Sequence, residues 1–227
     1  MITIKLGGSV LQETIDAMNP HIFSFIQKLE ELDDSFVITV GGGKISRLLI
    51  NPVKEAGGDS EDMHKIGIRA VLLQAEYVRA LLPRDRTFPY IIESERMMEE
   101  AKSVQGQYKY FVSGSWFVGS SSDFAGVTTA ALFGTDKLLR ISNIDSVYDK
   151  DPRTHHDAQK LDRITWDEYL NIIGNPSQHE PGGSYPIDPL SARFAREKEI
   201  TIYFTDLSSF LVCREINFNN FHGTIIR

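Results

Sequence analysis

The sequence predicts an α/β fold in which a mostly parallel sheet is covered by helices on both faces. Segments with strand character alternate with segments of helical period along the chain, and a nearly continuous apolar strand lies close to the amino terminus. Two early strands also run directly into glycine turns that lead towards helices. Alternating strands and helices are typical of parallel sheets, and continuous apolar strands are typical of sheets that are buried on both faces.

The first strand–helix unit opens the chain. Residues Ile2–Leu6 alternate with β-branched content and continue into Gly7-Gly8-Ser9, which is the pattern of a strand that ends in a glycine turn. A helix is expected from Pro20 to Leu32, because apolar residues recur there at helical spacing and proline is tolerated in a first turn.

The second unit repeats this arrangement. The apolar strand Phe36–Val40 meets Gly41-Gly42-Gly43, and an amphipathic segment follows from Lys44 to Ala56. Pro52 lies within that segment and is expected to kink or split the helix, because proline lacks the N–H that continues a helical ladder.

A long helix is predicted next, from an N-cap at Ser60 to about Leu82, with Ile66, Ala70 and Leu73 on its buried face. The remaining chain continues the alternation. Short strands are expected at Tyr90–Ile92, Tyr108–Val112, Lys137–Ile141 and Thr201–Phe204, and helices at Glu95–Ser103, Asp123–Phe133, Trp166–Ile173 and Asp188–Glu197.

Composition limits the class of protein. The 227 residues are 41% hydrophobic and 24% charged, which favours one domain over residues 1–227 with a sizeable core. The net charge of −7 disfavours a nucleic-acid partner, so phosphate binding is expected to be local. A single cysteine, Cys213, fits a reducing compartment, and no apolar run reaches the roughly 20 residues of a membrane helix. We therefore expect a soluble, cytoplasmic protein without a membrane partner.

The two glycine turns are candidate phosphate sites. Such turns expose backbone N–H groups to an anion, and the helix that follows adds positive potential. Glycines also often serve only to make turns, but two such turns favour an anion site. Neither turn matches a Walker sequence or a dinucleotide fingerprint. Lys5 lies two residues before the first glycine pair, where its ammonium can reach over the turn towards a bound phosphate.

Four motifs in order carry a family resemblance: "IKLGGSVL", "TVGGGKISRLLI", "SSSDFAGVTTAALFGTDKLLRISNIDSVYDKDPR" and "YPIDPLSARFAREKEITIYF". Together they resemble the amino acid kinase superfamily, and most of all its uridylate kinases of archaeal type. The resemblance implies a three-layer α/β/α sandwich with a mostly parallel central sheet. It also implies ATP- and Mg²⁺-dependent phosphoryl transfer to a small-molecule acceptor and a homo-oligomer, either a dimer or a hexamer.

The resemblance also assigns roles to residues of this chain. Asp123 corresponds to the family aspartate that orients the lysine and the glycine turns, so it joins Lys5 as a catalytic residue. The part of the chain that binds ATP is mainly 121–227. The expected ATP contacts are Gly7, Gly8, Ser9, Gly43, Arg47, Ser142, Asn143, Asp145, Tyr148 and Asp151.

The acceptor is expected to bind mainly within residues 1–120. The family resemblance and neighbouring positions point to Gly42, His64, Gly67, Gly114, Ser115, Trp116 and Gly119. His64 stands where uridylate kinases of this type carry an aspartate towards the ribose hydroxyls. Trp116 and Phe117 stand in a loop that is otherwise small and polar, and so add apolar bulk where uracil or its phosphate is expected.

These departures leave three interpretations open. UMP is the leading acceptor; another small phosphomonoester or alcohol in a more apolar pocket is the first alternative. The third is a non-catalytic nucleotide-binding or storage homologue that kept the fold. The run His155-His156-Asp157 could suggest a metal site, but its loop setting without a further nearby ligand argues against one, so no protein-bound metal centre is expected.

Overall fold

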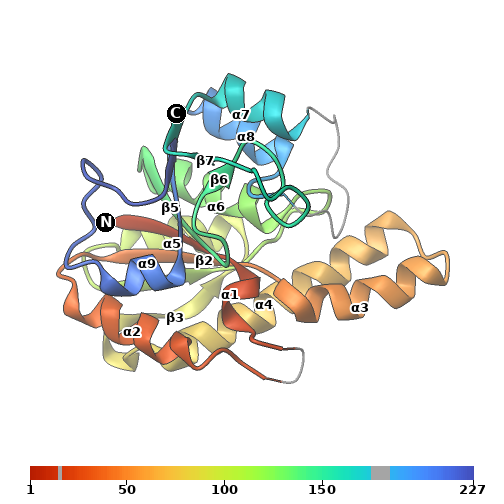
Figure 1. Cartoon of the computed structure of the whole chain (residues 1–227). Helices are drawn as coiled ribbons and strands as arrows, with labels where there is room; N and C mark the ends of the chain where they lie inside the picture. Colours follow the sequence, from red (N-terminus) through yellow and green to blue (C-terminus); the bar gives the residue numbers. More distant parts are fainter. Residues whose placement is uncertain (15–16, 175–184) are drawn as a thin grey trace.

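The computed structural model describes residues 1–14, 17–174 and 185–227, and its centre is an eight-stranded sheet with helices on both faces (Figure 1). The strand order is β3-β4-β2-β1-β5-β9-β10-β8, and the pairings are parallel except between β9 and β10. The strands are β1 (Ile2–Leu6), β2 (Phe36–Val40), β3 (Thr87–Ile92), β4 (Tyr110–Ser113), β5 (Lys137–Ser142), β8 (Arg163–Ile164), β9 (Thr201–Asp206) and β10 (Thr224–Ile226).

Helices cover the sheet in two layers. On one face, α2 (His21–Glu31), α4 (Ser60–Leu81) and α9 (Leu207–Val212) share a core with the strands through side chains such as Phe25, Val78 and Phe210. On the other face lie α5 (Glu95–Ser103), α6 (Ser122–Leu132), α7 (Trp166–Ile173) and α8 (Pro189–Glu197). The predicted three-layer α/β/α sandwich with a mostly parallel sheet is therefore confirmed.

Five further elements complete the description. Helix α1 (Gly8–Leu11) follows β1 directly, and α3 (Gly43–Glu55) packs along α4. Strands β6 (Val147–Tyr148) and β7 (Lys160–Leu161) form a separate hairpin-like pair near the cavity described below. A short 3₁₀ turn at Arg84–Arg86 leads into β3.

The helix predictions needed corrections at α3 and α4. Helix α3 runs unbroken through Pro52, so the predicted split is wrong. The N-cap of α4 is Asp59, whose carboxylate accepts a hydrogen bond from the backbone N–H of Asp62, and not Ser60. The buried face of α4 is also rotated from the predicted one: Leu73 is exposed, whereas Val71 and Ala75 are buried.

Alternation along the strands places polar side chains on the face covered by α6. Ile4 and Leu6 of β1 belong to the core with α2 and α9, so Lys5 points to the opposite face. There it lies under α6, where a Cβ atom on Gly126 would sit 3.2 Å from Cδ of Lys5. In the strand register Lys5 is paired with Thr39 of β2 and with Arg140 of β5.

Candidate functional site

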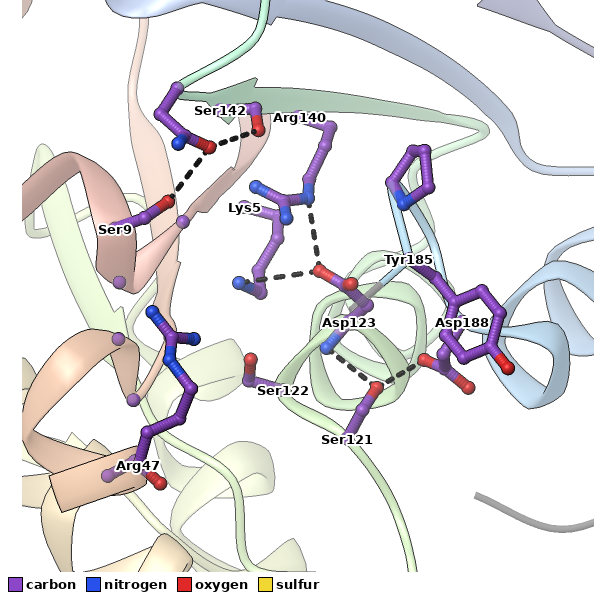
Figure 2. Close-up of a pocket in the computed structure, with 18 of the residues that line it drawn as sticks. Lys5, Ser9, Arg47, Ser121, Ser122, Asp123, Arg140, Ser142, Tyr185 and Asp188 are labelled. Atoms are coloured by element: carbon purple, nitrogen blue, oxygen red, sulfur yellow. Dashed lines mark hydrogen bonds and ion pairs between the residues drawn. The ribbon is translucent and has the colours of Figure 1, made fainter. Parts of the chain in front are cut away.

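A cavity of about 690 Å³ opens where β1, β2 and β5 end. Ligands in open α/β sheets bind in crevices outside the carboxyl ends of the strands, and this cavity has that location. Its lining includes both glycine turns, the start of α6, the segment after β5 and parts of α3 and α4. Figure 2 shows the polar side chains at its centre.

The two glycine turns meet backbone to backbone in this cavity. A Cβ atom on Gly8 would lie 2.6 Å from Cα of Gly43, and Gly43 itself has a positive φ of 57°. Side chains do not fit at such a contact, so glycine is required at both positions. Both turns open helices whose first N–H groups lack intrahelical carbonyl partners. At α3 the N–H groups of Lys44 and Ile45 donate to the Gln12 side chain, so the backbone donors offered to an anion are those of the glycine turns themselves.

Lys5 occupies the floor of the cavity. The residue is 1% exposed, and its ammonium lies 3.4 Å from Oδ1 of Asp123 and 3.3 Å from the carbonyl oxygen of Leu6 (Figure 2). Burial lowers the pKa of Lys5 from 10.5 to about 8, Asp123 opposes this change, and the positive charge of Arg140 adds to it. The predicted pairing of Lys5 with Asp123 is present in the structure.

Asp123 is placed by a network at the start of α6. The hydroxyl of Ser121 accepts hydrogen bonds from the backbone N–H groups of Asp123 and Phe124 at 3.0 and 3.1 Å, and donates one to Asp188. The Asp188 carboxylate also accepts from two backbone N–H groups at the start of α8 and from the Ser191 hydroxyl. Because Asp188 is 3% exposed, this network fixes α6 against α8 and aims Asp123 at Lys5.

Arg140 is a cationic residue of the site that the sequence analysis missed. Its Nε lies 3.0 Å from Oδ1 of Asp123, the same oxygen that faces Lys5. Its Nη1 donates to the carbonyl oxygen of Ile141 at 2.9 Å, and the residue is 9% exposed. A charged residue within the buried strand Lys137–Ser142 was a signal that could have identified it, because buried charges are rare without a partner.

The segment after β5 forms the wall next to the first glycine turn. Ser142, Asn143, Tyr148 and Asp151 line the cavity, and the Ser9 hydroxyl donates to the Asn143 side chain at 3.2 Å. Asp145 is outside the described lining. Its carboxylate instead accepts from the Tyr148 hydroxyl at 2.9 Å and pairs with Lys160.

The predicted acceptor residues fall into two groups. The cavity is lined by Gly42, His64, Gly67 and Ser115, and also by Arg47 of α3, which was predicted to contact ATP. Three others, Gly114, Trp116 and Gly119, are not part of the lining formed by the described residues. The expected apolar bulk of Trp116 is thus directed elsewhere: its ring lies 4.9 Å from that of Phe117 and packs against the core cluster that contains Phe111.

Other lining residues had no counterpart in the predictions. The apolar side chains Ile50, Met63, Ile68 and Val71 lie beside His64, and the hydroxyls of Ser46 and Ser122 add polar groups. The Ser115 hydroxyl is buried without a hydrogen-bond partner among the described residues, so it is available to a ligand. Ser115 was predicted from its loop, whereas the apolar side chains and the serines of α3 and α6 were missed because single serines and apolar helix residues carry no spacing signal.

The described residues contain neither a cluster of metal ligands nor a membrane-spanning helix. Among residues 1–14, 17–174 and 185–227, no group of three or more His, Cys, Asp or Glu side chains is arranged to hold a metal ion. Within the same ranges, no helix combines the length and apolar character needed to cross a membrane.

The amino-acid sequence of this chain is similar to those of known proteins. Residues 101–206 match the model of the amino acid kinase family. A uridylate kinase from Thermococcus kodakarensis is 30% identical over 205 residues, which are 89% of this chain and 88% of the relative. A uridylate kinase from Methanococcus maripaludis is 31% identical over 195 residues, covering 85% of this chain and 84% of the relative.

Solved structures show the same relationship. The crystal structure of uridylate kinase from Archaeoglobus fulgidus superposes with a TM-score of 0.79 at 25% identity, and the match covers 100% of both chains. The UMP kinase from Bacillus anthracis has a TM-score of 0.80 at 18% identity, covers 100% of this chain and 95% of its own, and supports the fold alone.

Proposed function

Because the chain belongs to the amino acid kinase family, we propose that it is a uridylate kinase that transfers the γ-phosphoryl group of ATP to UMP. Relatives that carry the name uridylate kinase match it over most of their length. UMP is therefore preferred over the other small phosphates and alcohols that the sequence alone left open.

One observation carries the proposal. The turns around Gly8 and Gly43 are in contact, and Lys5 lies in the same cavity next to Gly41, where a Cβ atom would be 2.9 Å from its ammonium nitrogen. Backbone donors from two strands and a buried cation thus face one space. This is the arrangement that the crowded negative charge of a triphosphate requires.

The reaction is a direct displacement. A phosphate oxygen of UMP forms a bond to the γ-phosphorus of ATP while the bond from that phosphorus to the bridging oxygen of ADP breaks. Catalysis of such a transfer consists mainly of positioning and charge stabilisation. Lys5 neutralises charge on the transferring group, and Asp123 keeps Lys5 in place.

The two substrates occupy the two ends of the cavity. ATP lies towards the Gly7-Gly8-Ser9 turn and the segment around Ser142 and Tyr148, in the part of the chain mainly within 121–227. UMP lies towards Gly42, His64 and the apolar side chains of α3 and α4, mainly within 1–120. Arg47 of α3 lines the same cavity and is assigned to ATP.

Mg²⁺ fits this site as a companion of ATP. It is usually held by substrate phosphates, water and one or two carboxylates. Asp123 and Asp188 line the cavity but are engaged by the contacts described above. The ion would therefore bind mainly through the phosphates, and it would supply further charge neutralisation during transfer.

The cellular setting is part of the same proposal. We place the protein in the cytoplasm, which agrees with a chain that has one cysteine. We also propose that it works as a homo-oligomer, consistent with exposed apolar residues such as Leu48, Leu49 and Leu73 on α3 and α4.

The test is an acceptor panel. Purified protein with ATP and Mg²⁺ is incubated with UMP, CMP, isopentenyl phosphate or small alcohols, and ADP and product are measured. The proposal predicts UDP formation and the highest kcat/KM for UMP. Preferred turnover of another acceptor would contradict the substrate, and ATP binding without turnover of any acceptor would favour a storage or regulatory role.

A further inference from the structure

Two cations share a single carboxylate oxygen at the floor of the cavity. Lys5 and Arg140 are paired positions on the adjacent parallel strands β1 and β5, so their side chains emerge side by side on the face covered by α6. Both approach Oδ1 of Asp123, at 3.4 and 3.0 Å. Neighbouring like charges on a sheet are unfavourable, and one carboxylate oxygen only partly compensates two cations.

The other carboxylates among the described lining residues, Asp188 and Asp151, give little further compensation by contact, and Asp151 is paired with Arg153. Asp188 already accepts hydrogen bonds from the hydroxyls of Ser121 and Ser191 and from two backbone N–H groups. It contributes to the field at Lys5 but contacts neither cation in the part of the chain that the structure describes. The pair is therefore arranged for a further anion.

Arg140 keeps donors for such an anion. A guanidinium carries five N–H bonds, and one of them is used by the Ile141 carbonyl. The Nε group lies near Asp123 at ion-pair distance but without hydrogen-bond geometry. Because the side chain lines the cavity, its other donors can reach a ligand there.

The two cations face different ends of the cavity. Lys5 borders the second glycine turn, where a Cβ atom on Gly41 would lie 2.9 Å from its ammonium and 3.2 Å from the Ser122 hydroxyl. Arg140 borders the first turn, where a Cβ atom on Gly7 would lie 2.7 Å from Nη1. In Figure 2 the guanidinium lies beside the Lys5 side chain, on the side of Ser142.

We propose that Arg140 is a second catalytic cation, which binds the β-phosphate of the donor nucleotide and stabilises ADP as it leaves. This rests on the proposed function, because it assigns the first glycine turn to ATP. As the bond between the γ-phosphorus and the bridging oxygen breaks, negative charge moves onto the ADP phosphates. A planar guanidinium suits that charge, because it can donate two parallel hydrogen bonds to one phosphate.

The experiment compares Arg140→Gln and Arg140→Lys with the wild type. Arg196→Gln serves as the matched control. Arg196 of α8 is half-exposed, pairs with Asp167 of α7 and does not belong to the described lining. Binding of ADP and of AMP is measured by calorimetry, and UDP formation by steady-state kinetics. The ADP–AMP comparison isolates the β-phosphate, because the two ligands differ only there.

Arg140→Gln is expected to weaken ADP binding at least about tenfold, to leave AMP binding within about twofold, and to lower kcat by about 10- to 100-fold. Arg140→Lys keeps the charge and should lose less on each measure, while Arg196→Gln should match the wild type. Equal effects on ADP and AMP, or no effect on ADP, would overturn the inference. If Arg140→Gln does not fold, unchanged ADP binding in Arg140→Lys has the same consequence.

Failure of the proposed function gives a different pattern. In that case the wild type itself would bind neither ADP nor ATP, or would bind them without forming UDP from UMP. A wild type that binds ADP and makes UDP, together with an unaffected Arg140→Gln variant, would instead remove only Arg140 from the account.

Discussion

The backbones of Gly8 and Gly43 are in direct contact at the centre of the cavity. A Cβ atom on Gly8 would lie 2.6 Å from Cα of Gly43 and 2.5 Å from the carbonyl oxygen of Gly41. These glycines come from turns that follow different strands, β1 and β2, which are themselves paired in the sheet. Their contact is what joins two separate turns into one anion-binding surface.

Gly8→Ala is therefore expected to separate the turns. The added methyl group has only backbone to displace, so we expect a loss of about 1–3 kcal/mol in the free energy of unfolding and a large fall in ATP affinity. Denaturant unfolding and calorimetry with ATP measure the two effects. Gly106→Ala is the control, because a Cβ atom there meets nothing within 4 Å. Wild-type ATP affinity in Gly8→Ala would contradict the role of the contact.

Lys5→Ala is expected to lower turnover at least about 100-fold while the protein remains folded. The substitution removes the cation at the transferring phosphoryl group, and Arg140 is still present to pair with Asp123. Steady-state UDP formation gives the rate, and circular dichroism with a thermal melt checks the fold. A fully active Lys5→Ala variant would remove Lys5 from the mechanism.

The pKa of Lys5 predicts an alkaline limit to activity. Because burial lowers this pKa to about 8 in the protein without nucleotide, kcat/KM should fall about tenfold per pH unit above pH 8. The charged groups that face Lys5 are Asp123, Arg140 and, further away, Asp188. In Arg140→Gln the pKa of Lys5 should rise, because a repelling charge is lost, and the limit should move to higher pH. An unchanged limit would contradict the coupling.

The same pKa affects stability with a definite sign. Between pH 8 and 10.5 the unfolded chain still holds the Lys5 proton while the folded chain has released it. The unfolded state then binds more protons, so this group makes the free energy of unfolding rise with pH over that interval. Denaturant unfolding of wild type and Lys5→Met at several pH values isolates the effect. A difference between them that stays flat from pH 8 to 10.5 would contradict the lowered pKa.

His64 and Trp116 are expected to differ in what they control. His64 lines the acceptor end, so His64→Ala should raise KM for UMP about tenfold and leave KM for ATP within about twofold. Trp116 packs against Phe117 and the core, so Trp116→Thr should lower the free energy of unfolding by about 2 kcal/mol and leave KM for UMP nearly unchanged. The reverse pattern, with Trp116→Thr changing KM for UMP, would place Trp116 at the acceptor.

Much of the fold was predictable because its signals are local. Strands β1 and β2 and helices α5 and α7 begin and end at the predicted residues, since apolar period, caps and glycine turns coincide there. Strand β10 was not predicted. It is three residues long, and its antiparallel pairing with β9 and parallel pairing with β8, both distant or weak signals in the sequence, give it strand structure.

The site residues were predictable where a sequence motif contains them. They were less predictable where tertiary packing determines which side chains meet. Lys5 and Asp123 meet as expected, because a strand end and a helix start converge on one edge of the sheet. Arg140 was missed because its partner, Lys5, is 135 positions away in sequence and becomes its neighbour only through the β1–β5 register. Trp116 was assigned to the acceptor by position in a loop, but its direction depends on the aromatic cluster behind that loop.

The most direct test of the account is a crystal structure with a non-hydrolysable ATP analogue, Mg²⁺ and UMP. It should place the triphosphate against the backbone of Gly8 and Gly43, with a γ-phosphate oxygen about 3 Å from Nζ of Lys5 and in line with the UMP phosphate. A triphosphate bound elsewhere, with Lys5 still covered and paired only with Asp123, would contradict the central claim.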